Sequence, residues 1–333
     1  PLRLVGSEMC IRDRVDIQFS IKDNFLEKLG LKKGTMDLKD PEEQKNTHSK
    51  LIKTFGVSKD ACGGSATNTI YAASILGSNC SFIGKVADDS NGNFYIDNLN
   101  KAGIKNDCMS ESKGVSGNCL IMISPDAERT MSTFLGISSE LQKIDIKEEL
   151  VSEAEIVYLE GYLASSDSCN EASNEIIRLA NENKTKVAIS LSDPNIVEAF
   201  KDRLEEWMEN KIDYLFCNEE EAKAFSGSSD LEIAKKELSK LAETCFITRG
   251  NEGAIVISNG EDIKIDGFKA NAIDSNGAGD MFAGATLYKI SSGESSKNAA
   301  KFGCFLASKG VENYGPRLLD EDYRKYQQLF NEI

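Results

Sequence analysis

The sequence predicts an α/β protein with a mostly parallel central sheet, helices on both faces of that sheet and a small second β-sheet. From about residue 150, short runs rich in Val, Ile, Leu and Phe alternate with stretches of helical periodicity. The segments at about 17–38 and 115–137 instead carry strand patterns with no crossover helix evident. Strands that alternate with helices form a parallel sheet, and such sheets bind ligands beyond the carboxyl ends of their strands.

The amino-terminal segment differs from the rest of the chain. Residues 1–14, PLRLVGSEMCIRDR, have no helix or strand period and resemble a translated sequencing adapter. We therefore expect a non-native segment outside the fold, followed by one domain over residues 15–333 whose first strand includes Val15.

The small sheet is expected from two segments that are far apart in the chain. VSGNCLIMISPDAERTMSTFLG, which begins at residue 115, reads as two strands around the turn PDAE. Together with the segment at about 17–38 it can form a sheet over the cleft of the main domain, which we call the lid. No Pro/Gly linker or internal repeat is present, so the lid is predicted to be an insertion rather than a second domain.

A glycine pair precedes the first helix of the main domain. Gly63, Gly64 and Ser65 come before a helix that carries Asn68 one turn in, and the strand CSFIGKV and the polar turn ADDSNG follow. Backbone at a glycine pair can approach a ligand closely, and the Asn68 amide can point at sugar hydroxyls. A simple tight turn before a helix is the alternative.

The later elements follow the predicted alternation. Amphipathic helices are expected over residues 168–183 and 230–243, where apolar residues recur every three or four positions. Buried strands are expected at 155–162, 187–193, 213–221, 245–250 and 253–258.

The segment NAIDSNGAGDMFAGATLYKI, residues 271–290, places small residues and two aspartates before an apolar helix. The first N–H groups of a helix have no internal partner, so small residues there leave a cup that binds anions. A carboxylate in that cup, Asp280, repels the anion unless it accepts a proton from a group that attacks the anion. Phosphoryl transfer to a hydroxyl has this requirement. An ordinary helix start with an acidic first turn is the alternative.

Composition excludes several functions. The formal net charge of -15 disfavours non-specific binding to nucleic acid, and no apolar run approaches the roughly 18 residues of a membrane span. The nine cysteines include no C-x-x-C pair, and the single histidine, His48, excludes a Ser-His-Asp triad. We expect a cytoplasmic protein whose general base is a carboxylate and whose partners are small molecules.

The two glycine motifs together resemble the PfkB (ribokinase) family of carbohydrate and nucleoside kinases, over about residues 15–319. The family signature D-T-x-G-A-G-D is matched by residues 274–280, with Ser275 in place of Thr. Its amino-terminal signature is matched by the glycine pair, by Asn68 and by the run from Gly84 through Asp88 or Asp89 to Gly92. The resemblance implies a ribokinase-like three-layer α/β/α sandwich with a small β-sheet lid.

The resemblance also implies roles for individual residues. Asp280 is the expected base, and the amides of Gly277, Ala278 and Gly279 stabilise the transferring phosphoryl group. Glu221, in the N-x-x-E match, is expected to hold Mg²⁺ through water, although an N-cap with an acidic first turn explains the same residues. The expected acceptor-binding residues are Asp16, Gly63, Gly64, Ser65, Asn68 and Arg129. The expected ATP-binding residues are Asn195, Asn218, Thr248, Arg249, Gly250 and Asn313.

The lid segment suggests the acceptor. PDAERTMSTFLGIS looks like the lid stretch of adenosine-kinase-like members, which implies transfer of the ATP γ-phosphoryl group to adenosine, giving AMP in purine salvage. Arg129 is then a lid residue near the acceptor, or alternatively a solvated turn arginine. Phe134 either stacks on a purine or belongs to the core. A monovalent cation such as K⁺ and a monomeric or homodimeric state are also compatible with the family.

Other functions remain as alternatives. A ribokinase- or fructokinase-like sugar kinase shares most of these residues, and a catalytically silent sugar or nucleoside sensor would also bind the ligand. A NAD-dependent dehydrogenase is disfavoured because no glycine fingerprint follows a first strand.

The amino terminus departs from the family pattern G-N-x-x-x-D. Asp16 matches the Asp, whereas Ile11 and Arg12 stand where the Gly and Asn are expected. Charged residues in a buried strand are costly, so we expect this chain to bind its acceptor weakly.

Overall fold

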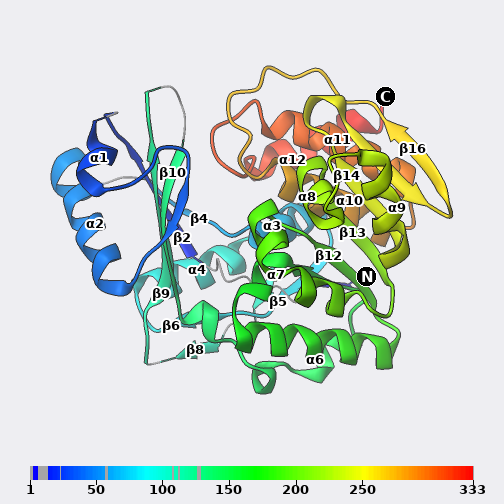
Figure 1. Ribbon diagram of the computed structural model, residues 1–333, viewed down its shortest axis with the longest axis horizontal. Coiled ribbons are helices and arrows are strands. Elements are labelled where there is room, and N and C mark those ends of the chain that lie inside the picture. The colour runs from blue at the N-terminus through cyan, green and yellow to red at the C-terminus, as the bar shows by residue number, and fades with distance from the viewer. Residues whose placement is uncertain are drawn as a thin grey trace.

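The computed structural model describes residues 3–6, 14–22, 24–56, 59–106, 109–111, 113–125 and 129–332. Figure 1 shows a large α/β domain and, at one side of it, a smaller sheet that carries two helices on its outer face. Among the described residues, no helix is long and apolar enough to cross a membrane.

The large domain is built on a nine-stranded sheet in the order β16-β15-β14-β13-β12-β11-β1-β5-β7. Neighbouring strands from β14 to β7 are parallel, whereas the pairs β14-β15 and β15-β16 at one edge are antiparallel. The strands are β1 (Arg3–Gly6), β5 (Asn79–Phe82), β7 (Lys105–Asn106), β11 (Ile156–Glu160), β12 (Lys186–Ser190), β13 (Ile212–Asn218), β14 (Ala242–Thr248), β15 (Ala254–Ser258) and β16 (Glu261–Ile265).

Alternation along the strands divides the core into two layers. In β11, Val157 and Leu159 pack in one hydrophobic cluster, whereas Ile156 and Tyr158 pack in the other. One face of the sheet is covered by α5 (Glu148–Ser152), α6 (Asp167–Asn183), α7 (Pro194–Trp207), α8 (Glu219–Ser226) and α9 (Leu231–Leu241). The other is covered by α3 (Ser65–Leu76), α4 (Ser90–Lys101), α10 (Ala278–Ser291) and α11 (Ser296–Gly310), with α12 (Asp320–Phe330) outside them. The predicted three-layer α/β/α sandwich is confirmed.

The second sheet contains both segments that the sequence assigned to the lid. Its order is β3-β10-β9-β2-β4, with α1 (Phe25–Leu29) and α2 (Pro41–Phe55) on its outer face. The buried side chain of Gln44 in α2 bonds to Asn118 and Ser132 and so fixes this helix on the sheet. The strands are β2 (Arg14–Ser20), β3 (Met36–Leu38), β4 (Lys59–Cys62), β9 (Ser116–Ile123) and β10 (Arg129–Gly136).

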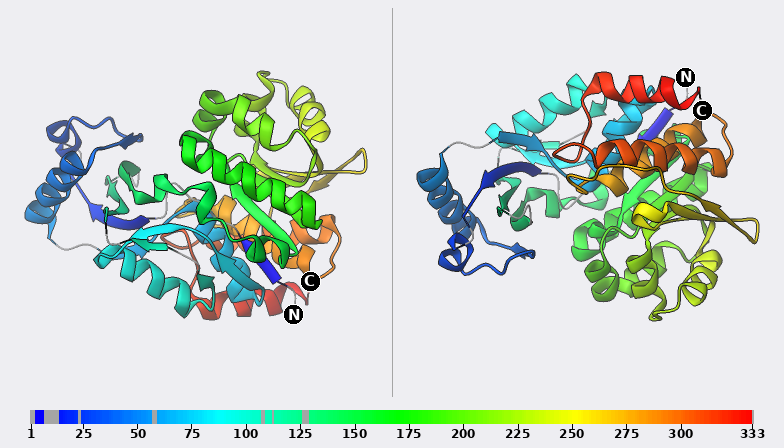
Figure 2. Two further views of the ribbon diagram at one scale, coloured as in Figure 1. Left: turned by 90° about the horizontal axis from the view of Figure 1, so that it is seen from below. Right: turned by 90° about the horizontal axis from the view of Figure 1, so that it is seen from above.

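The amino-terminal residues differ from the prediction. Instead of lying outside the fold, Arg3–Gly6 form the internal strand β1, which pairs in parallel with β11 and β5 and lies within the large domain in both views of Figure 2. The strand around Val15 belongs to the lid instead, because its apolar residues alternate and bury only one face. Ile11 and Arg12 lie outside the described residues.

One further prediction needs correction. CSFIGKV, expected as one strand, is divided between β5 and β6 (Lys85–Ala87), and β6 leaves the main sheet to pair with β8 (Met109–Glu111). The strands predicted after residue 150 correspond to β11–β15 and the two helices to α6 and α9.

Candidate active site

The helix α10 begins where the sequence predicts the anion-binding cup. Gly277 caps it with φ 72° and ψ 4°, and a Cβ at this position would lie 2.5 Å from the carbonyl oxygen of Pro316. The left-handed backbone and the tight contact both require glycine here. In contrast, a Cβ on Gly279 would meet no atom within 4 Å, so the first turn of the helix faces open space.

Asp280 is held by two residues from the other glycine motif. Ser65 Oγ donates to Asp280 Oδ1 at 2.6 Å, and Asn68 Nδ2 donates to Asp280 Oδ2 at 3.0 Å. Ser65 is the first residue of α3 and Asn68 lies one turn further on. Two motifs more than 200 positions apart therefore meet at one carboxylate, whose orientation is set by a donor on each oxygen.

The lid contributes Asp16 to the same region. Asp16, in β2, is buried, and a Cβ on Gly63 would lie 2.2 Å from its carboxyl carbon. The carboxylate therefore packs directly on the backbone of the glycine pair. A side chain at Gly63 would displace this carboxylate, and the contact joins the lid to the start of α3.

Two cavities meet at the beginning of α10. Both are lined by Thr248, Gly279 and Phe282. The smaller, about 80 Å³, also contains Asp280 and Glu221 in its wall. The larger, about 300 Å³, has mostly small and apolar walls, and further lining residues include Gly250, Phe268, Ala270, Cys304, Ala307 and Val311. The helix start thus separates a polar chamber from an apolar one.

Glu221 is a buried carboxyl in the polar chamber. It forms a capping box with Asn218: Asn218 Oδ1 accepts from the Glu221 amide at 2.8 Å, and the Glu221 side chain accepts from the Asn218 amide at 3.0 Å. Burial, together with the negative charges of Asp193 and Asp280, raises the pKa of Glu221 to about 7. Asn218 is therefore the N-cap of α8 and Glu221 belongs to its acidic first turn, as the alternative interpretation of the sequence predicted. This capping role is compatible with a functional role of Glu221.

The chemistry of this carboxyl group fits a hydrated cation better than a directly coordinated one. Among the residues that the structure describes, no three His, Cys, Asp or Glu side chains converge closely enough to hold a metal ion. Glu221 also accepts a bond from Asn218 Nδ2 at 2.7 Å. Mg²⁺ keeps several waters in such sites and takes few protein ligands, so contact through water suits these residues.

Arg129 connects the lid to the loop before α10. It forms an ion pair with Asp274, which also accepts from the amides of Asn276 at 3.0 Å and Gly315 at 2.8 Å. Only 17% of the Arg129 side chain is exposed, so it is not a solvated turn residue. Its buried Nη1 has no hydrogen-bond partner among the described residues.

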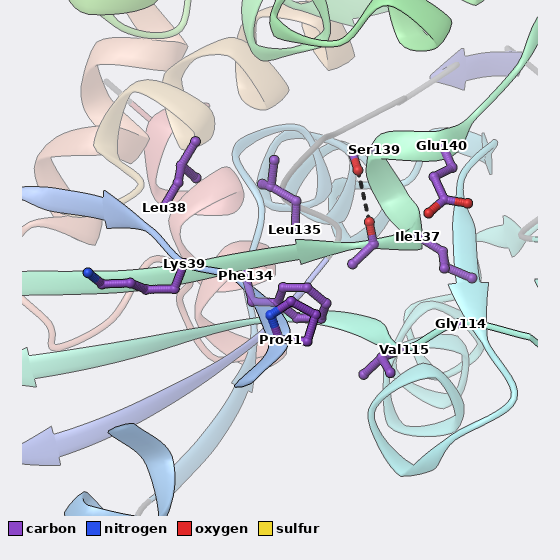
Figure 3. Close-up of a pocket in the computed structure, with 11 residues that line it drawn as sticks. Leu38, Lys39, Pro41, Gly114, Val115, Phe134, Leu135, Ile137, Ser139 and Glu140 are labelled. Carbon is purple, nitrogen blue, oxygen red and sulfur yellow. Dashed lines mark hydrogen bonds between the residues drawn. The ribbon is translucent and has the colours of Figure 1, made fainter. Parts of the chain in front are cut away.

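Phe134 lies on the face of the lid sheet opposite to the face that carries Arg129. Ser132, two residues earlier in the same strand, bonds to Gln44 of the outer helix α2. Because side chains two residues apart share a face of a strand, Phe134 is also on the side of α2. Phe134 accordingly lies beside Pro41 in a separate cavity of about 410 Å³ (Figure 3). It is on the face away from Arg129, which does not support stacking on a purine in the cleft.

Three predicted ATP-binding side chains do not line either cavity. Asn195 Nδ2 donates to Asp193, and Asn313 Nδ2 donates to the Lys309 carbonyl oxygen. Arg249 lies between Glu219 and Glu252, which raise its pKa. Thr248 and Gly250, by contrast, lie in the cavity walls.

Two residues that support the site are not predicted from the sequence. Glu160, fully buried at the end of β11, accepts from the Ala66 amide at 2.8 Å and so anchors the start of α3. A carboxylate at the carboxyl end of an apolar strand was a signal for it. Arg317 donates to Asn68 from a distant loop, and nothing in its local sequence indicates this contact.

The carboxylate of Asp280 is thus oriented by two donors beside an open helix start, on a three-layer α/β/α sandwich with a β-sheet lid, and this arrangement suits phosphoryl transfer to a hydroxyl group. The model of the pfkB family carbohydrate kinases matches residues 23–322, and the chain belongs to that family. This confirms the resemblance on which the expected roles depend, and ATP use follows from the family.

Known proteins that resemble the chain include nucleoside and sugar kinases. An adenosine kinase of Saccharomyces cerevisiae is 26% identical over 95% of this chain and 96% of its own length. A 5-dehydro-2-deoxygluconokinase of Clostridium perfringens is 27% identical over 76% of this chain and 78% of its own length. The crystal structure of adenosine kinase from Sinorhizobium meliloti superposes with a TM-score of 0.88, at 27% identity, covering 99% of this chain and 100% of that one.

Proposed function

We propose that this kinase transfers the γ-phosphoryl group of ATP to the 5′-hydroxyl of adenosine, giving AMP and ADP. The observation that carries the proposal is the position of Asp280, which is held by Ser65 and Asn68 in the wall of the polar chamber, next to Gly279, which borders both cavities. A base at this point can reach an acceptor on one side of the helix start and a phosphate on the other.

Each side chain has a defined part in the reaction. Asp280 accepts the proton of the attacking hydroxyl while the acceptor oxygen forms its bond to the γ-phosphorus and the bond to the ADP oxygen breaks. The amides of Gly277, Ala278 and Gly279 stabilise charge on the transferring group. Glu221 would hold Mg²⁺ through water, and the ion would supply positive charge that offsets the charge of the phosphates. A monovalent cation such as K⁺ can add positive charge near the loop before α10.

The apolar cavity suits the donor nucleotide. Its walls of small and apolar residues, including Phe268 and Ala307, can accept a flat purine ring, while Thr248 and Gly250 lie at its border with the helix start. We assign this cavity to the adenine and ribose of ATP.

We assign the acceptor to the side of the α10 start that is opposite to the apolar cavity, under the lid. Asp16 can accept hydrogen bonds from sugar hydroxyls beside Gly63 and Gly64, and Nη1 of Arg129 can donate from the lid. Closure of the lid excludes water and suppresses ATP hydrolysis. Nothing in this arrangement requires nucleic acid or a membrane, and the site lies within one protomer.

Adenosine is preferred over a free sugar for two reasons. The lid sequence resembles that of adenosine-kinase-like members, and two of the relatives described above are adenosine kinases that match nearly the whole chain. A sugar kinase is the second candidate, favoured by the match to a 5-dehydro-2-deoxygluconokinase.

The decisive experiment measures ADP and phosphorylated product with ATP and Mg²⁺ across adenosine, inosine, ribose, fructose and 5-dehydro-2-deoxygluconate. An Asp280→Asn variant runs alongside, and Asp266→Asn, at an exposed carboxylate, is the matched control. We expect adenosine to be phosphorylated with the highest kcat/KM and Asp280→Asn to lose at least about 100-fold in kcat. Preferential turnover of a sugar would contradict the proposed acceptor, and unchanged activity of Asp280→Asn would contradict the proposed base.

A further inference from the structure

Residues 315–317 contact both signature motifs at once. The Gly315 amide donates to Asp274 Oδ2 at 2.8 Å, and Pro316 packs against Gly277. Arg317 Nε donates to Asn68 Oδ1 at 2.8 Å. Three consecutive residues near the carboxyl end of the chain therefore contact the loop before α10, the cap of α10 and the helix that carries Asn68.

Arg317 is held rigidly in this position. Its Nη1 donates to Asn98 Oδ1 at 2.8 Å, and its guanidinium lies 4.2 Å from the centre of the Tyr71 ring. The Tyr71 hydroxyl in turn donates to Asp320 at the start of α12. A planar guanidinium stacked on a ring and bonded at two edges has little freedom left, which a lysine could not reproduce.

The bond to Asn68 fixes which end of the amide faces the base. An asparagine amide has one accepting oxygen and one donating nitrogen. Because Arg317 has only donors, it holds the Asn68 oxygen, and the Asn68 nitrogen must then point away from Arg317, toward Asp280. The positive charge on Arg317 also polarises the amide and strengthens its donation to the carboxylate.

We infer that Arg317 is a positioning residue of the kinase, which orients Asp280 through the side-chain amide of Asn68. Arg317 itself contacts neither the proposed reacting atoms nor either cavity at the start of α10. Its effect therefore falls on the chemical step and not on the binding of ATP. The inference rests on the proposed role of Asp280 as the base.

A double-mutant cycle tests this inference. Arg317→Met, Asn68→Ala and the double variant are compared by kcat, KM for ATP and melting temperature. We expect Arg317→Met to lower kcat about 10- to 100-fold, with the KM for ATP within about twofold, because small misplacements of catalytic groups have losses of that size. If Arg317 acts through Asn68, the double variant loses no more than Asn68→Ala alone.

Two further variants distinguish positioning from general stability. Arg203→Met is the matched control: Arg203 also bonds to two acceptors, the Ala164 carbonyl oxygen and Asp167, and lies over the Phe200 ring, but it is outside the site. The Arg203→Met variant should have a lower melting temperature and an unchanged kcat. Arg317→Lys keeps the charge and much of the stem over Tyr71 but loses the paired N–H groups, so it should fold and still lose kcat.

The outcomes are separable. Losses that multiply in the double variant, or a kcat of Arg317→Lys within twofold of the unmodified chain, would overturn the inference. Equal losses of kcat in Arg203→Met and Arg317→Met would overturn it as well. An unmodified chain that phosphorylates no acceptor would count against the proposed function, whereas an active chain with indifferent Arg317 variants would count against this inference alone.

Discussion

Arg129, the first residue of the lid strand β10, forms an ion pair with Asp274, the first residue of the D-S-N-G-A-G-D motif. Only 8% of the Asp274 side chain is exposed, and the carboxylate also receives two backbone amides. The pair thus connects the lid to the loop that leads into α10.

The ion pair should couple acceptor binding to turnover. We expect Arg129→Gln to raise the KM for the acceptor and lower kcat together, about 10-fold or more in kcat/KM, because breaking a largely buried pair leaves an uncompensated charge on Asp274. Steady-state kinetics for both substrates, together with ATP hydrolysis in the absence of acceptor, measure the effect. Combination with Asp274→Asn should be strongly non-additive, and simple addition of the two losses would disprove the coupling.

Gly277 and Gly279 should respond differently to the same substitution. Gly277→Ala places a Cβ against the Pro316 carbonyl in a left-handed backbone, so we expect a loss of at least about 1–3 kcal/mol in the free energy of unfolding. Gly279→Ala meets open space and should unfold like the original chain, while its methyl group narrows the junction of the two cavities and lowers kcat/KM for ATP. Urea unfolding and kinetics on both variants test this contrast. Equal stability of the two variants would count against it.

Glu221 should make stability depend on pH. Its pKa is raised by burial from the ordinary 4.5 to about 7, so the folded state keeps a proton that the unfolded chain releases. The contribution is fully present below pH 4.5 and is lost as pH rises toward 7, by up to about 3 kcal/mol at about 1.4 kcal/mol per pKa unit. Without Mg²⁺, the free energy of unfolding should therefore fall more steeply over this interval than in Glu221→Gln. If the free energy of unfolding had the same pH dependence in the unmodified chain and in Glu221→Gln, the raised pKa of Glu221 would be disproved.

Cation binding should oppose this protonation. If Glu221 holds Mg²⁺ through water, the affinity for Mg²⁺ should rise between about pH 6 and 8 as the carboxyl group ionises. Titration calorimetry with Mg²⁺ and ADP measures it, with Glu221→Gln as the variant that lacks the ionisation. A pH-independent affinity in the unmodified chain would argue against a role for this carboxylate.

The apolar cavity should affect the binding of ATP and not the binding of the acceptor. Ala307→Phe fills part of the cavity of about 300 Å³ with a larger side chain, so we expect the KM for ATP to rise about 10-fold or more while the KM for the acceptor changes little. Kinetics with each substrate varied in turn measure both constants. A selective rise in the acceptor KM would indicate that the apolar cavity binds the acceptor and not ATP.

Periodicity and motif spacing predicted the main elements because these depend on nearby residues. The alternation after residue 150 identified β11–β15, and the glycine motifs identified the starts of α3 and α10. The strand β1 was missed, since a four-residue run such as Arg3–Gly6 is too short to show a period. Its pairing is set by β11 and β5, which come much later in the chain.

Part of the site was predictable from the motifs. Ser65, Asn68 and Asp280 follow from them, and the structure brings all three together. Asn195 and Arg249 were also expected from the resemblance, yet nearby carboxylates hold their side chains. Arg317 and Glu160 act through tertiary contacts, which no spacing in one sequence reveals.

The contacts made by residues 315–317 have a consequence for biosynthesis. A chain emerging from a ribosome folds from its amino terminus, so α3 with Ser65 and Asn68 is complete long before α10 and the loop that carries Arg317. An unfinished chain thus contains Ser65 and Asn68 but lacks both Asp280 and Arg317. The hydrogen bonds around Asp280 can therefore form only when synthesis is nearly finished.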